Sequence, residues 1–128
     1  MLSHPVLDIH VHPPFLSAYT EEGLSYAMEV NPSAIDTTMR LREPRAFLDF
    51  FQQNGVDHVV LLAEEAPLVS GMVKSEAVIE FAAGAEGLYA FVSLNPWLEG
   101  DLVRSLDRLL AMGPVAGASA TRRLSTCV

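Results

Sequence analysis

Short apolar segments alternate with amphipathic segments along this chain of 128 residues, and their spacing constrains the fold more than any other feature. Corresponding points at Val56, Leu88 and Val115 lie 32 and 27 residues apart, close to the ~30 residues of one strand-and-helix unit. Strands that alternate with helices build a parallel sheet covered by helices. The spacing therefore predicts an α/β fold, either a barrel or a doubly wound sheet.

The element boundaries follow from apolar periodicity and from capping residues. Predicted strands cover Val6–Val11, Val56–Ala63, Leu88–Leu94 and the residues from Val115 to Ala118. Val56–Ala63 is nearly continuous in apolar residues, so we expect it to be buried on both faces. Predicted helices begin at Glu43-Pro44, Ser75 and Asp101 and end at Asn54-Gly55, Ala83 and Met112, with Gly113 as the last C-cap.

The long segment Phe15–Leu41 separates the first strand from its helix. Thr20 is placed to cap a short helix that runs to Glu29, and Asn31-Pro32-Ser33 predicts a turn before another helix. An insertion here would lie over the carboxyl ends of the strands, where such folds keep their active sites.

Charge and cysteine content exclude several classes of protein. Sixteen acidic against eight basic residues give a net charge of -8, which argues against nucleic acid or anionic lipid as a partner and favours small molecules or proteins. A single cysteine, Cys127, excludes an internal disulfide framework and fits a reducing compartment. The chain has no apolar run of ~20 residues and no signal-peptide pattern at its start. We therefore expect a cytoplasmic protein without membrane association.

Asp8-Ile9-His10-Val11-His12 ends the first predicted strand and precedes Pro13-Pro14. Alternation along a strand would place Asp8, His10 and His12 on one face, where two imidazoles can bind one Zn²⁺ or similar ion. Asp8 would then orient an imidazole or act as a structural hydrogen bonder. Judged by spacing alone, two surface histidines in a half-buried strand are the more common situation, but the position at the end of the first strand favours a metal site.

Five segments of the chain, spanning about residues 7–118, resemble the amidohydrolase-related family, which includes decarboxylase-like metal-dependent hydrolases. The His-x-His of the first strand is the most specific of them. The segments are Asp8–Pro14, Val59–Leu62, Glu76–Ile79, Phe91–Trp97 and Val115–Gly117.

The resemblance implies a TIM-type (β/α)8 barrel that binds one or two divalent metal ions, usually zinc. Metal-activated water would then act on a small carboxylate or cyclic substrate, or the metal would hold a carboxylate for non-oxidative decarboxylation. Only His10 and His12 carry over from the family pattern, as metal ligands. No catalytic base is identifiable in this chain, because the family's other ligands lie on later strands.

The resemblance stops at about Ser119, so residues 1–118 are interpreted as the N-terminal portion of such a barrel, about three and a half strand-and-helix units. Residues 119–128 follow neither a strand nor a helix pattern and are expected to be a disordered tail left by truncation. Such a chain would be inactive alone and prone to associate with itself through open barrel edges. The alternative is a non-catalytic fragment or a small α/β interaction domain without metal.

Other polar residues at strand ends receive less specific predictions. Glu64-Glu65 ends the second strand, where solvation of a loop is favoured over a place beside the histidines. Trp97 follows the third strand and is placed either to contact a ligand or to cover the edge of the barrel. Glu76 and Glu80 predict a solvated helix face.

The remaining histidines and the cysteine are not expected to act in chemistry. His58 begins a strand, at the end of the barrel that is associated with stability, so we interpret it as structural. His4 lies in a terminal segment expected to be mobile. Nothing in the sequence around Cys127 indicates an activated thiolate.

Overall fold

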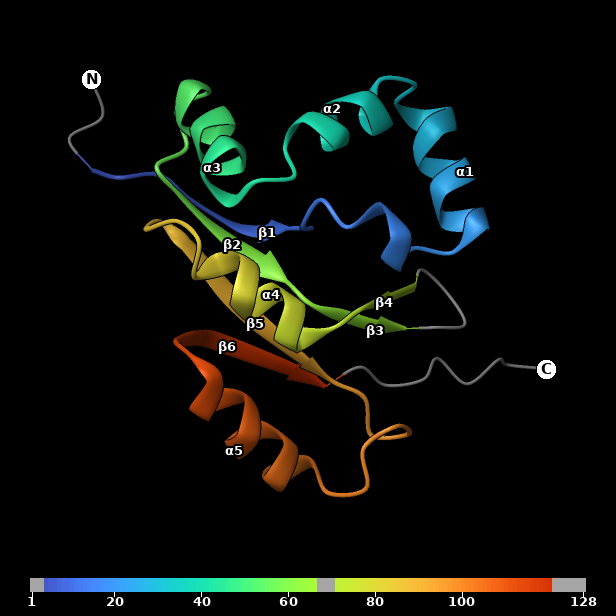
Figure 1. The fold of residues 1–128 in the computed structure, drawn as a ribbon, viewed down its shortest axis with the longest axis vertical. Helices are drawn as coiled ribbons and strands as arrows, with labels where there is room; N and C mark the ends of the chain where they lie inside the picture. Colours follow the sequence, from blue (N-terminus) through green and yellow to red (C-terminus); the bar gives the residue numbers. More distant parts are fainter. Residues whose placement is uncertain (1–3, 67–70, 121–128) are drawn as a thin grey trace.

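Four parallel strands form the central sheet of the structure, a computed structural model that describes residues 4–66 and 71–120. Beyond the carboxyl end of the second strand, the antiparallel hairpin β3 (Glu64–Ala66) and β4 (Gly71–Val73) continues the chain (Figure 1). The strands of the sheet lie in chain order, as β1 (Leu7–Val11), β2 (His58–Leu62), β5 (Leu88–Leu94) and β6 (Val115–Ala120).

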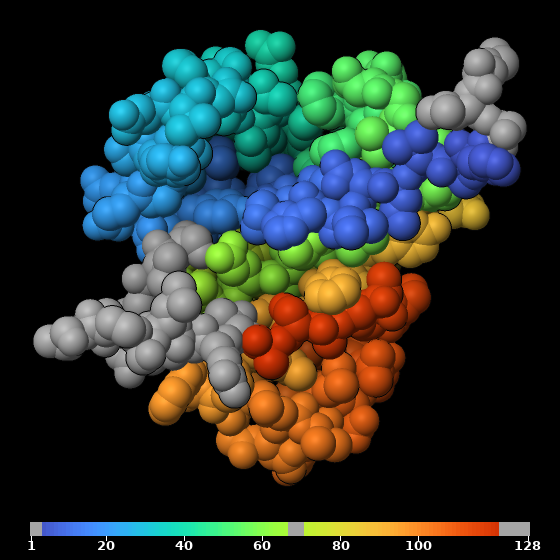
Figure 2. All heavy atoms as spheres, turned by 180° about the vertical axis from the view of Figure 1, so that it is seen from behind, coloured from blue at the N-terminus to red at the C-terminus, as the bar shows by residue number. Residues whose placement is uncertain are grey.

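A helix that packs on the sheet comes directly before each of the strands β2, β5 and β6. These helices are α3 (Pro44–Gln53), α4 (Ser75–Ala82) and α5 (Leu102–Met112), and they pack on one face of the sheet (Figure 1). On the opposite face, the strands lie side by side with no described helix in front of them (Figure 2). The described residues thus form an α/β fold whose parallel sheet carries helices on one face, unlike a doubly wound sheet, which carries them on both.

Capping residues set the helix ends where the sequence predicts them. The side chain of Thr20 accepts a hydrogen bond from the Gly23 amide at 3.1 Å, and α1 (Glu21–Val30) begins there. The Asp101 carboxylate accepts one from the Arg104 amide at 3.0 Å, at the start of α5. Each cap satisfies a backbone N–H that has no partner within its helix.

The core lies between the sheet and the helices. Val59, Leu61, Ala90 and Val92 alternate along β2 and β5, and each is 0% exposed. They pack with apolar side chains of the three helices in a single hydrophobic cluster, to which Phe47, Leu48, Val78, Ile79 and Leu109 belong. Val60, on the opposite face of β2, is also buried, at 7% exposed. The prediction that this strand is buried on both faces is confirmed for its three central residues.

The segment between β1 and α3 forms a short 3-10 helix (Leu16–Ala18), α1 and α2 (Ala34–Arg40). It lies beyond the carboxyl end of β1, as expected for an insertion over this end of the sheet (Figure 1). Neither α1 nor α2 has a fully buried residue, so both helices sit on the surface of the core rather than within it.

Two differences from the predictions change the assignment of a segment, at the end of β6 and after β2, whereas the bounds of β1, β2, α4 and α5 differ by only one or two residues. β6 continues to Ala120, because Ser119 and Ala120 keep the register of the strand and pair with Ser93 and Leu94. These two residues therefore belong to the sheet and not to the expected tail. The rest of that tail, including Cys127, lies outside the described residues.

The chain after β2 is the second difference, because it forms the strand β3 and not a solvated loop end. Glu65 lies in this strand and is only 7% exposed. Its backbone carbonyl accepts a hydrogen bond from the Asn95 side chain at 2.8 Å. The prediction of loop solvation is therefore wrong for Glu65, since the contact with the end of β5 holds β3 against the sheet.

Candidate metal centre

His10 and His12 lie at the carboxyl end of β1, but the strand is not regular along its length. Asp8 pairs with Val59 and Val11 pairs with Leu61, so three steps on β1 face two steps on β2. This bulge places Asp8 and Val11, rather than Asp8 and the histidines, on the same face of the sheet. The prediction that Asp8 shares a face with both histidines is therefore wrong, because the bulge inserts one residue between them.

Asp8 stabilises this irregular part of the strand. Its carboxylate Oδ1 accepts a hydrogen bond from the His10 backbone amide at 3.0 Å. A short side chain that bonds the backbone two residues further on is typical of Asp at turns and bulges. Of the two roles predicted for Asp8, the structure thus shows the structural hydrogen bond.

The imidazole rings of His10 and His12 lie close to each other, although Val11 separates the two residues in sequence. Their centroids are 5.4 Å apart, and the ring planes meet at 68°. Both residues are exposed, whereas Val11 packs against the hydrophobic core. The bulge therefore preserves the pairing of the two histidines that the His-x-His spacing predicts.

A carboxylate from the next strand joins the pair. Glu64 begins β3 just after β2, and its Oε2 lies 3.8 Å from Nδ1 of His12. The side chains of His12 and Glu64 are 45% and 32% exposed, so solvent still reaches both groups. The sequence offered two roles for Glu64, solvation of a loop or a place beside the histidines, and favoured solvation. The structure shows the second arrangement, with Glu64 beside His12.

Tyr19 also lies close to Glu64. Burial, and then the negative charge of Glu64, raise the pKa of the Tyr19 hydroxyl to about 12. The backbone of Tyr19 pairs with Gly71 at the start of β4, which fixes it beside the hairpin. The sequence reasoning missed Tyr19, and only its place in the inserted segment over the strand ends pointed toward it.

The chemistry of these side chains fits a divalent metal ion such as Zn²⁺, which binds imidazole nitrogen and carboxylate oxygen. The fit is incomplete within one chain. Among residues 4–66 and 71–120, no group of three or more His, Cys, Asp or Glu residues is gathered closely enough to hold an ion. His10, His12 and Glu64 thus supply donors of the right kind, but they do not form a closed coordination sphere.

Asn95 and Trp97 at the end of β5 have structural surroundings. Asn95 is 8% exposed, and its Oδ1 accepts a hydrogen bond from the Trp97 amide at 3.0 Å. Together with its bond to β3, this fixes the turn that leaves β5. The Trp97 side chain is 70% exposed, so it does not cover the sheet within this structure.

The predicted solvated face of α4 is only partly present. Glu80 is exposed, but the Glu76 carboxylate pairs with Arg108 of α5 at 2.7 Å. Burial acts to raise the Glu76 pKa, yet a hydrogen bond with its own backbone and the contact with Arg108 lower it overall. The Glu76 side chain is still 36% exposed, so solvent reaches it, and the ion pair with Arg108 of α5 is the feature that the prediction lacked.

His58 and His4 lie apart from the paired histidines. His58 begins β2, at the amino end of the sheet, and its ring centroid is 5.9 Å from that of Tyr89. His4 is exposed near the beginning of the described chain. Neither histidine is close to His10 or His12 in the described contacts.

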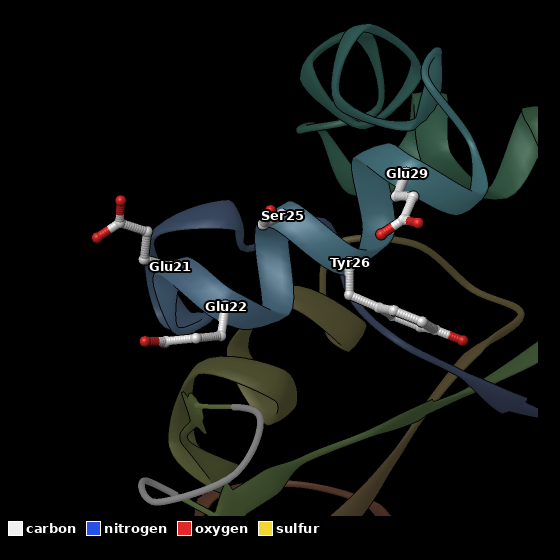
Figure 3. A pocket seen from close by; sticks show the side chains of 5 residues that line it. All are labelled: Glu21, Glu22, Ser25, Tyr26 and Glu29. Carbon is white, nitrogen blue, oxygen red and sulfur yellow. The ribbon is translucent and has the colours of Figure 1, made fainter.

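A separate depression of about 560 Å³ lies along α1. Its lining residues all come from this one helix, and their side chains point in different directions rather than toward a common centre (Figure 3). They are Glu21, Glu22, Ser25, Tyr26 and Glu29. The depression is therefore the open flank of a helix and includes neither histidine of the pair.

No protein-family model, curated protein or solved structure was found to match this chain. Membership of the amidohydrolase-related family therefore stays a prediction from the motif residues, chiefly His10 and His12. Over the part of the chain that the structure covers, no helix has the length and apolar character needed to cross a membrane.

Proposed function

We propose that this chain carries the first metal ligands of a hydrolase or non-oxidative decarboxylase of the amidohydrolase-related family. His10 and His12 would hold the cation, most simply Zn²⁺. The observation that carries the proposal is the pair of imidazoles, 5.4 Å apart, at the carboxyl end of the first strand of a parallel sheet. In barrels of this architecture, catalytic groups stand at the carboxyl ends of the strands.

The sheet supports the same proposal. Its four strands run in chain order and are parallel, and one helix on the outer face follows each of the first three. A (β/α)8 barrel begins in this way, with its strands curving around a common axis and its helices outside. The inserted helices α1 and α2 lie beyond the strand ends, where they would border a substrate (Figure 1).

Each side chain at the site has a role that its position allows. Glu64 lies on the Nδ1 side of His12, so Nε2 is the nitrogen left for a cation, and the carboxylate would orient the ring once it moves from 3.8 Å to hydrogen-bond distance. The Tyr19 hydroxyl is protonated at neutral pH, as an ordinary tyrosine is, and its pKa of about 12 keeps it so in more alkaline solution, so it can donate a hydrogen bond to a substrate carboxylate. A bound Zn²⁺ would supply Lewis acidity toward a substrate oxygen and lower the pKa of water.

Ligand binding tests this proposal without requiring turnover. The chain is loaded with Co²⁺, and its visible absorption is recorded as benzoate, a simple carboxylate, is added. We expect the spectrum to shift with benzoate in the wild-type chain and in His4→Ala, which removes an exposed histidine elsewhere. We expect neither cobalt absorption nor a shift in the double variant His10→Ala/His12→Ala. A cobalt-loaded wild-type chain whose spectrum ignores benzoate would contradict the proposal.

A further inference from the structure

Strand β6 is an unusually unprotected sheet edge. Its sequence, Val115-Ala116-Gly117-Ala118-Ser119-Ala120, contains only small uncharged residues apart from Val115, and four of the six are exposed. Natural edge strands are normally blocked by charged side chains, by proline or by a covering segment. Within the described chain, β6 has none of these, and the other edge strand, β1, has no partner on its outer side either. The described sheet therefore has two open edges, of which β1 carries the charge of Asp8 and a bulge, and β6 carries no charge and is irregular in register only near its start.

Among residues 4–66 and 71–120, no helix covers the face of the sheet opposite α3, α4 and α5. Strands β2, β5 and β6 contain no Asp, Glu, Lys or Arg. Large apolar side chains remain accessible on β1 and β5: Leu7 is 49% exposed, Ile9 is 70% exposed and Tyr89 is 41% exposed. Figure 2 shows this face, where side chains of the four strands form a continuous surface. Exposed apolar surface of this kind marks a site of association.

We propose that a second copy of this chain covers the face, with β6 of each copy paired in parallel to β1 of the other. A twofold axis parallel to the strands relates the copies and keeps all strands parallel. It satisfies both edges of both copies at once and gives eight strands, the number of a closed parallel barrel. The two edges also match in length, since β1 has five residues and β6 has six.

Another arrangement of two copies satisfies the observations less well. Antiparallel pairing of β6 with β6 of a second copy would leave both β1 edges and much of the apolar face exposed. The net charge of -8 opposes any self-association, but Asp8 is the only Asp, Glu, Lys or Arg on the four strands of the sheet. Repulsion between the other charges is screened beyond ~8 Å at physiological ionic strength.

Closure of the barrel also completes the metal centre, a consequence that rests on the proposed function. In a barrel of eight strands, β1 and the partner's β1 stand on opposite sides of one opening. His10 and His12 then face His10 of the partner subunit and His12 of the partner subunit across the axis. The donors that a single chain lacks would come from the second copy, so one cation is shared by two chains.

Sedimentation of the metal-free chain tests the closure. We expect a species of twice the chain mass. Ile9→Lys, on β1, should weaken its association by at least about tenfold, and Leu7→Lys should act in the same direction. Val103→Lys is the matched control, because Val103 is 72% exposed on α5 and Ile9 is 70% exposed. Circular dichroism checks that each variant is folded. A monomer, a large aggregate, or a dimer that Ile9→Lys and Leu7→Lys leave intact would overturn the inference.

Zinc stoichiometry separates this inference from the proposed function. One ion bound per two chains, with His10→Ala/His12→Ala binding none, supports both. One ion bound per chain would overturn the shared centre and leave the proposed function standing. A dimer that binds no zinc would leave the closure standing and contradict the proposed function.

Discussion

Ser75 links α4 to β5, and its removal gives the sharpest stability prediction. The side chain is 1% exposed. Its Oγ donates a hydrogen bond to the Ser93 carbonyl at 2.9 Å and accepts one from the Ser93 amide at 2.9 Å. The Ser75 hydroxyl thus bonds both the backbone carbonyl and the backbone amide of Ser93, a buried residue near the carboxyl end of β5. Ser75→Ala removes both contacts and leaves nothing of similar polarity in their place.

The expected cost follows from those two bonds. Each of the two hydrogen bonds contributes about 1 kcal/mol net. Ser75→Ala should therefore lower the free energy of unfolding by about 2 kcal/mol. With a urea dependence of about 2 kcal/mol per molar, the unfolding midpoint should fall by about 1 M.

Urea unfolding, followed by Trp97 fluorescence and by circular dichroism, measures this change. Wild type and variant are compared at one protein concentration, because association would otherwise alter the apparent stability. Ser25→Ala is the matched control, since Ser25 lies exposed on α1, and its effect should stay within about 0.5 kcal/mol. If the Ser75→Ala midpoint equals that of Ser25→Ala, the assigned role of the hydroxyl is refuted.

Three further predictions concern a cap, a glycine and an ion pair. Asp101→Ala should cost about 1 kcal/mol in urea unfolding, because it removes the N-cap of α5. Gly71→Ala should cost at least about 1–3 kcal/mol in the same assay, since φ is +137° and a Cβ would lie 2.1 Å from the Ala18 carbonyl oxygen. Glu76→Gln should cost under about 1 kcal/mol at pH 7. The folded-state pKa of Glu76 is lowered from 4.5, so the stability that its carboxylate contributes is fully present above pH 4.5. This stability is lost as the pH falls through the lowered pKa, so in acid unfolding experiments wild type and Glu76→Gln should become equally stable below it.

Helices and strands with strong local signals could be predicted from the sequence. Leu88–Leu94 forms β5 with the predicted bounds, because its apolar run is closed by Asn95-Pro96. Helix α5 begins at Leu102, one residue after its predicted start, because Asp101 is its N-cap, and it ends at Met112 as expected. In both elements, the residues that define the boundary are neighbours in sequence, so local chemistry is sufficient.

Features set by distant contacts could not be predicted. The hairpin strand β3 has three residues, too few for a periodic signal, and Asn95 of β5 helps to hold it. The bulge in β1 arises from its register against β2, which nothing in Asp8–His12 alone reveals. For the same reason, the pairing of Glu76 with Arg108 and the place of Tyr19 appeared only in the structure.

The proximity of His10 and His12 was therefore predicted from the sequence, their surroundings were not, and their role as metal ligands stays a prediction. The spacing of His10 and His12 brought the two imidazoles together, and the structure shows this geometry. The approach of Glu64 depends on how β2 continues into the hairpin. That continuation is a property of the folded chain rather than of the motif.

Zinc content after dialysis tests the central claim, that His10 and His12 hold a metal ion, most directly. The wild-type chain, His4→Ala and His10→Ala/His12→Ala are equilibrated with Zn²⁺ and dialysed against metal-free buffer, and zinc per chain is then measured by mass spectrometry. The account predicts that wild type and His4→Ala retain equal amounts of zinc and that the double variant retains none. Equal zinc in all three proteins would contradict it.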